Sequence, residues 1–332
     1  MLQHVYNLGN QINQELELSD NFSSPDYQDL LIVGMGGSGI AGDILKLLIN
    51  KYSTINVEVS KTYGIPSHLL KSKPTCLFLS YSGNTEETIS AVNEAIEHKL
   101  DWSVVSSGGE LIKIAEKNNK NYVKVPTGLQ PRAALGHMAR AVLHYLPTNI
   151  EFDFKIACEE VKNYINDLLE DDSQDNILEI SKKLSVEIGN KTVVIYGGTP
   201  GSYLAAQRWK TQINENSKSK AFVGYMPEIH HNEILSWDAD KSGSRSNFQV
   251  IFLRDDEEQE QIKKRFEFTK RIIGNDVNIF EVKNIPSKNI VKKLFHLILY
   301  GDLVSVFMAD NLSIDPYDIT NIENLKSMLK GN

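Results

Sequence analysis

The chain has 332 residues, a length that favours two domains of roughly 150 residues, each with its own hydrophobic core. Hydrophobic residues make up 41% and charged residues 23%, proportions that are ordinary for a folded protein and exclude a largely disordered chain. The formal net charge of −8 argues against general attraction to nucleic acid or anionic membranes, so an anionic ligand must be held by local groups.

The two cysteines and the N-terminal residues indicate the cellular compartment. Cys76 and Cys158 stand far apart and outside any C-x-x-C pattern, which predicts reduced structural thiols rather than a disulfide or a zinc site. The start, Met1-Leu-Gln-His, lacks the basic and apolar regions of a signal peptide, and no apolar run reaches the ~18 residues of a membrane span. We therefore expect a cytoplasmic protein without a membrane segment.

The first half alternates short apolar runs with amphipathic stretches, which predicts β-α units on a parallel sheet. The expected strands are Leu30–Val33, Ile55–Val59, Thr75–Ser80, Trp102–Ser106 and Tyr122–Val125. The clearest helix follows the third strand, where Ile89, Val92, Ile96 and Leu100 recur three or four apart and predict one buried face.

From about Arg140 to Asn190 helical patterns replace the strands, with helices expected at Ile156–Leu169 and Ile177–Ile188. We interpret residues 151–190 as a helical connector between a domain at 1–150 and a domain at 191–332. The second domain is predicted to contain strands at Thr192–Tyr196, Ala221–Tyr225, Phe248–Leu253 and Val277–Val282, and helices at Tyr203–Asn214 and from about Ser287 to Ala309.

The two predicted domains begin alike. Val33–Ala41 and Ile195–Ala205 each contain an apolar strand end, a Gly-Gly pair, a further glycine with a serine, and an alanine. Each loop follows the first strand of its domain, which weakly indicates an internal duplication.

The loop 34-GMGGSG-39 has two interpretations. It fits the G-x-G-x-x-G dinucleotide pattern, with Glu58 about 20 residues on to meet a ribose hydroxyl. It also fits a glycine-serine loop for a single phosphate, because any tight strand-to-helix turn favours glycine.

A second loop, 80-SYSGNTEET-88, favours the phosphate interpretation. Ser80, Ser82 and Thr85 supply three hydroxyls at a point where the first N–H groups of the following helix are unpaired. A phosphate dianion needs several donors at once, whereas a dinucleotide site has no need of this cluster. Thr85 also fits a simple helix cap, but capping leaves the preceding Ser-x-Ser-Gly unexplained.

These loops resemble those of the sugar isomerase (SIS) domain family, and Ser107-Gly108-Gly109 resembles its third loop. Further segments, in order, resemble the bifunctional phosphoglucose/phosphomannose isomerases, which are dimers of tandem SIS domains. The segments are Gln130-Pro131-Arg132-x-x-Leu135-Gly136, Arg208-Trp209-Lys210, Asn214-Glu215-Asn216-x-Lys218, Pro227-Glu228-x-x-His231-Asn232-Glu233, Asp315-Pro316 and Leu325-Lys326. The resemblance implies an α/β fold with two SIS domains, each a flavodoxin-like parallel sheet flanked by helices.

The implied reaction moves a proton between C2 and C1 of a sugar 6-phosphate through an enediolate. It needs a base, a cation beside the developing oxyanion, a group that opens the sugar ring and an anchor for the phosphate, but neither a metal nor a redox cofactor. The resemblance assigns the anchor to Gly36, Gly37, Ser38, Ser80, Ser82 and Thr85.

The remaining roles also come from the resemblance. Glu215 is the expected base, His231 the ring-opening acid and base supplied by the other subunit of a homodimer, Arg132 the cation for the enediolate and Lys326 the active-site lysine. Read without the resemblance, Arg132 fits an exposed salt-bridge partner, and His230 fits a surface or helix-cap histidine. Lys330 competes with Lys326.

Mannose 6-phosphate would share the enediolate, and either Ile319 or Thr320 would line the C2 pocket. Three other functions stay open at this stage. They are a non-catalytic SIS protein that senses a sugar phosphate, an NAD-binding Rossmann protein and an amino-sugar phosphate isomerase. A zinc phosphomannose isomerase is disfavoured, because His230, His231 and Glu233 are clustered but no separated third and fourth ligands of suitable spacing appear.

Overall fold

The computed structural model describes residues 1–20, 22–23, 26–238, 245–274 and 277–329. The chain divides into two compact units. The N-terminal unit contains Tyr6–Glu170 and Ser287–Lys292, and the C-terminal unit contains Met1–Val5, Asp171–Pro286 and Lys293–Asn332. Within the part that the structure describes, no helix combines the length and the apolar character needed to cross a membrane.

The N-terminal unit is built on a sheet in the order β1-β6-β5-β4-β2-β3, in which β1 runs antiparallel to β6 and the other pairs are parallel. The strands are β1 (Glu17–Leu18), β2 (Asp29–Gly34), β3 (Asn56–Ser60), β4 (Thr75–Ser80), β5 (Trp102–Ser106) and β6 (Tyr122–Lys124). Leaving out β1, this order is the flavodoxin-like one that the SIS resemblance implied.

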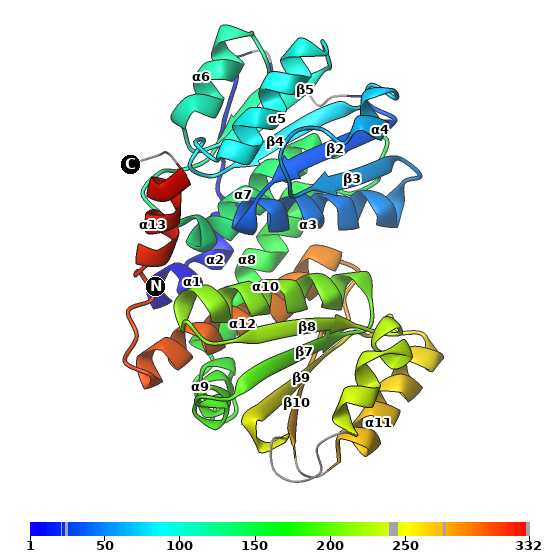
Figure 1. Ribbon diagram of the computed structural model, residues 1–332, viewed down its shortest axis with the longest axis vertical. Helices are drawn as coiled ribbons and strands as arrows, with labels where there is room; N and C mark the ends of the chain where they lie inside the picture. The colour runs from blue at the N-terminus through cyan, green and yellow to red at the C-terminus, as the bar shows by residue number, and fades with distance from the viewer. Residues whose placement is uncertain (21, 24–25, 239–244, 275–276, 330–332) are drawn as a thin grey trace. The chain divides into compact units, whose positions relative to one another are not determined.

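Helices cover both faces of this sheet, with α5 and α6 on one face and α3 and α7 on the other (Figure 1). Their bounds, with the neighbouring helices, are α1 (Leu2–Tyr6), α2 (Leu8–Asn13), α3 (Gly36–Tyr52), α4 (Ser67–Leu70), α5 (Glu86–Glu97), α6 (Gly109–Lys117), η1 (Pro131–Ala134), α7 (Leu135–Val142), η2 (Leu143–Tyr145) and α8 (Phe154–Glu170). Parallel strands buried on both faces read as continuous apolar runs, and for this reason the five strands could be found in the sequence.

The predicted face of α5 was partly wrong. Val92 is buried, and so is Leu100 just beyond the helix, but Ile96 is 36% exposed, and the other buried residues of the helix are Thr88, Ala91 and Ala95. The small alanine side chains let the helix approach the sheet closely, so the buried face is turned away from the line of larger apolar residues.

The C-terminal unit has a parallel four-stranded sheet in the order β10-β9-β7-β8, with α11 on one face and α10 and α12 on the other (Figure 1). The strands are β7 (Thr192–Gly197), β8 (Ala221–Tyr225), β9 (Phe248–Arg254) and β10 (Asn278–Lys283). The helices are α9 (Ile177–Ile188), α10 (Pro200–Asn216), η3 (Glu228–His231), η4 (Glu233–Trp237), η5 (Arg245–Asn247), α11 (Glu260–Ile273), α12 (Ile290–Asn311) and α13 (Thr320–Leu329).

In chain order this sheet repeats the first strands of the N-terminal sheet, because in both the second strand lies outside the first and the third lies on its other side. The repeated order agrees with the predicted duplication. The predicted limits of the connector, 151–190, stay a prediction; of its two helices, α8 belongs to the N-terminal unit and α9 to the C-terminal unit.

Candidate functional site

The two predicted phosphate loops follow β2 and β4, which are neighbours in the sheet although β3 lies between them in the chain. Here the strand order reverses direction, and in parallel α/β sheets ligands bind at such a point, beyond the carboxyl ends of the strands. The loop after β2 opens α3 at Gly36, and the loop after β4 opens α5 at Glu86. Both helix N-termini therefore begin at the edge where the loops meet.

The hydroxyl groups of the loops are hydrogen-bonded to one another and to the backbone. Ser38 Oγ accepts from the amide of Tyr81 at 3.0 Å, which ties the first loop to the second. Ser80 Oγ accepts from the amide of Gly83 at 3.1 Å and lies 2.8 Å from Thr85 Oγ1, while the exposed Ser82 accepts from the amide of Asn84 at 3.3 Å. When Ser80 donates to Thr85, the hydroxyl hydrogens of Ser38, Ser82 and Thr85 all remain available for an anion.

The third loop, Ser107-Gly108-Gly109, supports the second one. Ser107 Oγ donates to the carbonyl of Tyr81 at 2.6 Å, and the amide of Leu111 donates to the carbonyl of Gly83 at 2.9 Å. These bonds fix the backbone at both Tyr81 and Gly83, so the third loop supports the second loop structurally.

Arg132 lies beside the first loop. A Cβ added to Gly37 would come within 3.2 Å of the carbonyl oxygen of Pro131 and 3.6 Å of Cα of Arg132, so the absent side chain of Gly37 lets the two turns approach. Arg132 is 2% exposed, which corrects the alternative view of it as an exposed salt-bridge partner. A charged guanidinium is rarely buried without interactions that require it there.

Glu58 does not have the surroundings of a ribose ligand. Its Oε2 lies 3.3 Å from Nε2 of His68 in α4. A Cβ on Gly39 would lie 2.7 Å from the carbonyl oxygen of Gly34, so these two glycines allow strand β2 and helix α3 to touch.

The corresponding point of the C-terminal sheet lies between the loops after β7 and β9, and it is closed by a carboxylate. Thr199 Oγ1 donates to Asp255 Oδ2 at 2.7 Å, and Asn284 Nδ2 donates to Asp255 Oδ1 at 2.9 Å. A negative charge at this position repels an anion. The duplicated loop, although it also carries hydroxyl groups, is bonded to a carboxylate and is less suited to an anion than the N-terminal copy.

Glu215 lies in the last turn of α10 and is partly exposed. The helix is fixed from within by Arg208, whose guanidinium donates to both carboxylate oxygens of Asp302 at 3.0 and 2.8 Å, and by Trp209, whose Nε1 donates to the carbonyl of Leu297 at 2.7 Å. The Arg208-Trp209 pair of the family motif thus anchors the helix that ends at Glu215.

His231 is exposed at the end of η3, which follows β8. Glu215 and His231 lie near opposite ends of strand β8: Asn214 Nδ2 donates to the carbonyl of Ser219 just before β8, and the amide of Met226 donates to the carbonyl of Gly197 just after it. At ~3.3 Å per residue, β8 separates its two ends by about 16 Å.

His230 is neither a surface nor a cap residue. Its Nε2 lies 2.7 Å from Thr269 Oγ1 and its Nδ1 lies 3.0 Å from Nη1 of Arg265. Burial lowers the pKa of His230, and the charges of Arg265 and His231 lower it further, by smaller amounts. Both ring nitrogens are thus engaged, and nowhere among the described residues do three His, Cys, Asp or Glu side chains gather in a way that could hold a metal ion.

Lys326 lies on α13, whose described residues from 321 to 329 are exposed. Lys330 lies outside the described residues. Of the two candidates for the C2 pocket, Ile319 is half-buried and Thr320 is exposed, and Thr320 is held by Asp318, which accepts from its amide and its hydroxyl.

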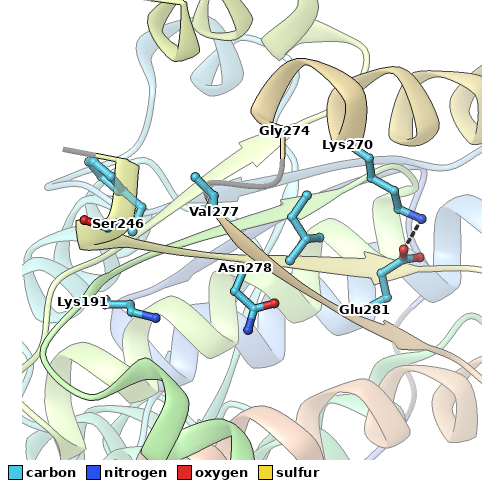
Figure 2. Close-up of a pocket in the computed structure, with 9 residues that line it drawn as sticks. Lys191, Ser246, Lys270, Gly274, Val277, Asn278 and Glu281 are labelled. Atoms are coloured by element: carbon cyan, nitrogen blue, oxygen red, sulfur yellow. Dashed lines mark ion pairs between the residues drawn. The ribbon is translucent and has the colours of Figure 1, made fainter. Parts of the chain in front are cut away.

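A pocket of about 740 Å³ in the C-terminal unit contains none of the predicted site residues (Figure 2). Its lining includes Lys270 of α11 and Glu281 of β10, which form an ion pair, and Lys191 and Asn278 at the amino ends of β7 and β10. Ligands of parallel sheets bind at the carboxyl ends of the strands, so this hollow is not the expected site.

Comparisons with known proteins agree with this fold. The SIS domain model matches residues 26–106, and the model described as the bacterial phospho-glucose isomerase C-terminal SIS domain matches residues 178–329. A structure of a hypothetical protein from Thermus thermophilus superimposes with a TM-score of 0.76 at 12% identity, covering 99% of this chain and 87% of that one, which is a likeness of fold.

Two curated relatives match most of the chain. One from Caldicellulosiruptor bescii, named bifunctional phosphoglucose/phosphomannose isomerase, is 32% identical, with 99% of this chain and 98% of the relative covered. Another from Sulfolobus acidocaldarius, named D-glucosamine-6-phosphate 4-epimerase, is 29% identical, with 88% and 86% covered. Identity of 32% along almost the whole length shows the family, and this chain belongs to the bifunctional phosphoglucose/phosphomannose isomerases.

Proposed function

We propose that this protein interconverts glucose 6-phosphate, and also mannose 6-phosphate, with fructose 6-phosphate by proton transfer through a cis-enediolate. The observation that carries the proposal is the junction of the Gly36–Ser38 and Ser80–Thr85 loops at the reversal of strand order, in a chain that belongs to this isomerase family. A negatively charged substrate without a basic surface to attract it needs such a local set of donors.

The phosphate would be bound by the amides of Gly36 and Gly37 and by hydroxyl groups. Ser38, Ser82 and Thr85 would donate hydroxyl hydrogens to the phosphate, and Ser80 would contribute by donating its own to Thr85. Binding the non-reacting end of the sugar in this way fixes which carbon faces the base, so binding energy is used for orientation. Arg132, whose backbone lies beside the first loop and whose side chain is buried, would stabilise with its guanidinium the negative charge that develops on the enediolate oxygens.

Proton transfer is assigned to Glu215. Its carboxylate would remove the proton from C2 and return it to C1, while Lys326 would assist ring opening. Glucose 6-phosphate and mannose 6-phosphate differ only in configuration at C2, so both give the same enediolate once that proton has left. One base therefore serves both sugars when the C2–C3 bond can rotate in the site.

The ring-opening role of His231 would be performed in the active site of a second copy. Two observations support this: Glu215 and His231 lie near opposite ends of strand β8, and His231 is exposed. A homodimer would then have two sites, each with the base of one copy and the histidine of the other. A charged sugar phosphate does not cross membranes unaided, which is consistent with work in the cytoplasm.

The test is a coupled assay of fructose 6-phosphate formation from each sugar in the presence of a metal chelator, run beside glucosamine 6-phosphate. We expect turnover of both neutral hexose phosphates and, in heavy water, deuterium in the product at C1. Binding of glucose 6-phosphate without turnover would instead favour a regulatory SIS protein, and turnover of glucosamine 6-phosphate alone would favour amino-sugar chemistry.

A further inference from the structure

The segment that carries His231 is anchored to the core by a chain of buried polar groups. Trp237 Nε1 donates to Tyr196 Oη at 3.1 Å, and Tyr196 Oη donates to Glu233 Oε1 at 2.5 Å. Tyr196 is fully buried and lies in β7, next to the end of the strand. The partly exposed carboxylate two residues after His231 is thus bonded to a side chain of a central strand.

Asn232, which lies between His231 and Glu233, makes a second set of hydrogen bonds. Asn232 Oδ1 accepts from the amide of Glu233 at 2.6 Å, and Asn232 Nδ2 donates to Glu228 Oε1 at 2.8 Å. The side chain of Asn232 therefore connects η3 to η4, since it bonds the first residue of each. A short turn with few backbone bonds is held in one conformation by these contacts.

The residue on the other side of His231 is also fixed. His230 is bonded to Thr269 and Arg265 on α11, as described above, and Ile229 packs into the core beside Tyr196. Gly224 in β8 makes this packing possible: a Cβ there would lie 2.7 Å from both the Tyr196 ring and Ile229. His231 is consequently an exposed imidazole on a turn whose neighbours on both sides are bound to the fold.

We propose that Tyr196 and Glu233 are positioning residues that hold the turn of His231 in the geometry required for ring opening in the isomerase reaction. The proposal rests on the function proposed above. An exposed loop histidine would otherwise sample many orientations, and acid–base catalysis requires its nitrogen at hydrogen-bond distance from the sugar oxygen. The strand supplies the rigidity that the turn lacks.

The kinetic test compares Tyr196→Phe, which removes only the hydroxyl, with Glu233→Leu, which removes the acceptor, and uses Leu235→Ala, at an exposed position of η4, as the control. We expect kcat for glucose 6-phosphate to fall about tenfold in both Y196F and E233L with little change in KM, and L235A to stay near wild type. In a His231→Asn background, Y196F should cause no further loss, because its effect acts through His231. Equal losses in both backgrounds would overturn the proposal by showing a general structural effect.

The second measurement is amide hydrogen exchange. Y196F should exchange faster at residues 228–233, with the rest of the described chain unchanged, and unaltered exchange there would also overturn the proposal. If the wild-type protein turns over neither sugar, both the proposed function and the positioning role are refuted. If the wild type is active and Y196F loses the same fraction of activity with and without His231→Asn, only the positioning role is refuted.

Discussion

Lys218 joins the end of α10 to the segment before α13: its Nζ lies 2.7 Å from the carbonyl oxygen of Glu215 and 3.2 Å from that of Asp315. Lys218 has a φ of 55°, the left-handed conformation in which a chain commonly leaves a helix. The proposed base and the Asp315–Thr320 segment, which holds the candidates for the C2 pocket, are therefore connected by one side chain.

Replacing Lys218 by methionine removes this connection while keeping an unbranched side chain that is only one atom shorter. We expect kcat to fall about tenfold with a small change in KM, because the base would be less well oriented while the phosphate loops stay intact. Steady-state kinetics with glucose 6-phosphate measure this. Lys220→Met changes an exposed lysine two residues away and serves as the control. Equal kinetics in the two variants would argue against the role of the bridge.

Glu215→Gln keeps the size of the side chain and removes the base. The expected loss in kcat is a factor of roughly 10² or more, with an unchanged melting temperature, since the carboxylate lies partly exposed at a helix end. Exchange of the C2 proton with solvent should be lost in parallel. Glu187→Gln, at an exposed position of α9, is the matched control, and near-normal turnover of E215Q would assign the base elsewhere.

Truncation of the phosphate loop should act mainly on substrate binding. Ser82→Ala and Thr85→Val each remove a hydroxyl group, and we expect KM to rise about tenfold with a smaller effect on kcat. Ser90→Ala, at an exposed position on the same helix α5, should leave both constants unchanged. Unaltered KM in both loop variants would mean that the phosphate is held by other groups.

Mixing two strongly impaired variants tests whether His231 acts across subunits. A mixed dimer contains one Glu215→Gln subunit and one His231→Asn subunit. If each active site takes Glu215 from one subunit and His231 from the other, one of the two sites of this dimer keeps both residues. If each site takes both residues from one subunit, neither site is intact. After unfolding and refolding an equal mixture, we expect about a quarter of wild-type activity. Sedimentation measurements verify the dimer. Absence of any recovered activity from a mixture that forms dimers would indicate that each copy uses its own histidine.

Stability should fall as the solution is acidified below neutral pH. Burial, only partly offset by a hydrogen bond with the carbonyl of Lys283, lowers the pKa of His296 from 6.5 to about 4. Burial also lowers the pKa values of His137 and His144 to about 4. Between pH 6.5 and 4 the unfolded chain therefore binds protons that the folded chain does not, so stability present above pH 6.5 is lost as the pH falls through this window.

His296→Gln keeps a donor for the carbonyl of Lys283 but does not titrate. Its free energy of unfolding should decrease less than that of the wild type from pH 7 to pH 5, by about 2 kcal/mol. Urea unfolding at several pH values measures the difference. His98→Gln, at an exposed position after α5, should follow the wild-type curve. Parallel curves for H296Q and wild type would show that His296 does not contribute.

Much of the fold could be predicted because its signals are local. Strands β4, β5 and β8 and helix α9 have the predicted bounds, since a buried strand or an amphipathic helix shows its burial in the order of its own residues. The loops with glycine and hydroxyl residues were recognisable for the same reason. The face of α5 was not, because Thr88, Ala91 and Ala95 are buried through close packing rather than through large apolar side chains.

The sequence by itself determined the strand-and-helix succession, the two glycine loops and the chemical types available for phosphate binding and proton transfer. Only the tertiary structure decided which groups meet. Strand order brings the loops after β2 and β4 together, closes the duplicated loop with Asp255, and separates Glu215 from His231 by the length of β8. Strand order, burial of Arg132 and the Tyr196–Glu233 bond all depend on packing between residues distant in the chain, and the periodicity of a single segment carries no record of it.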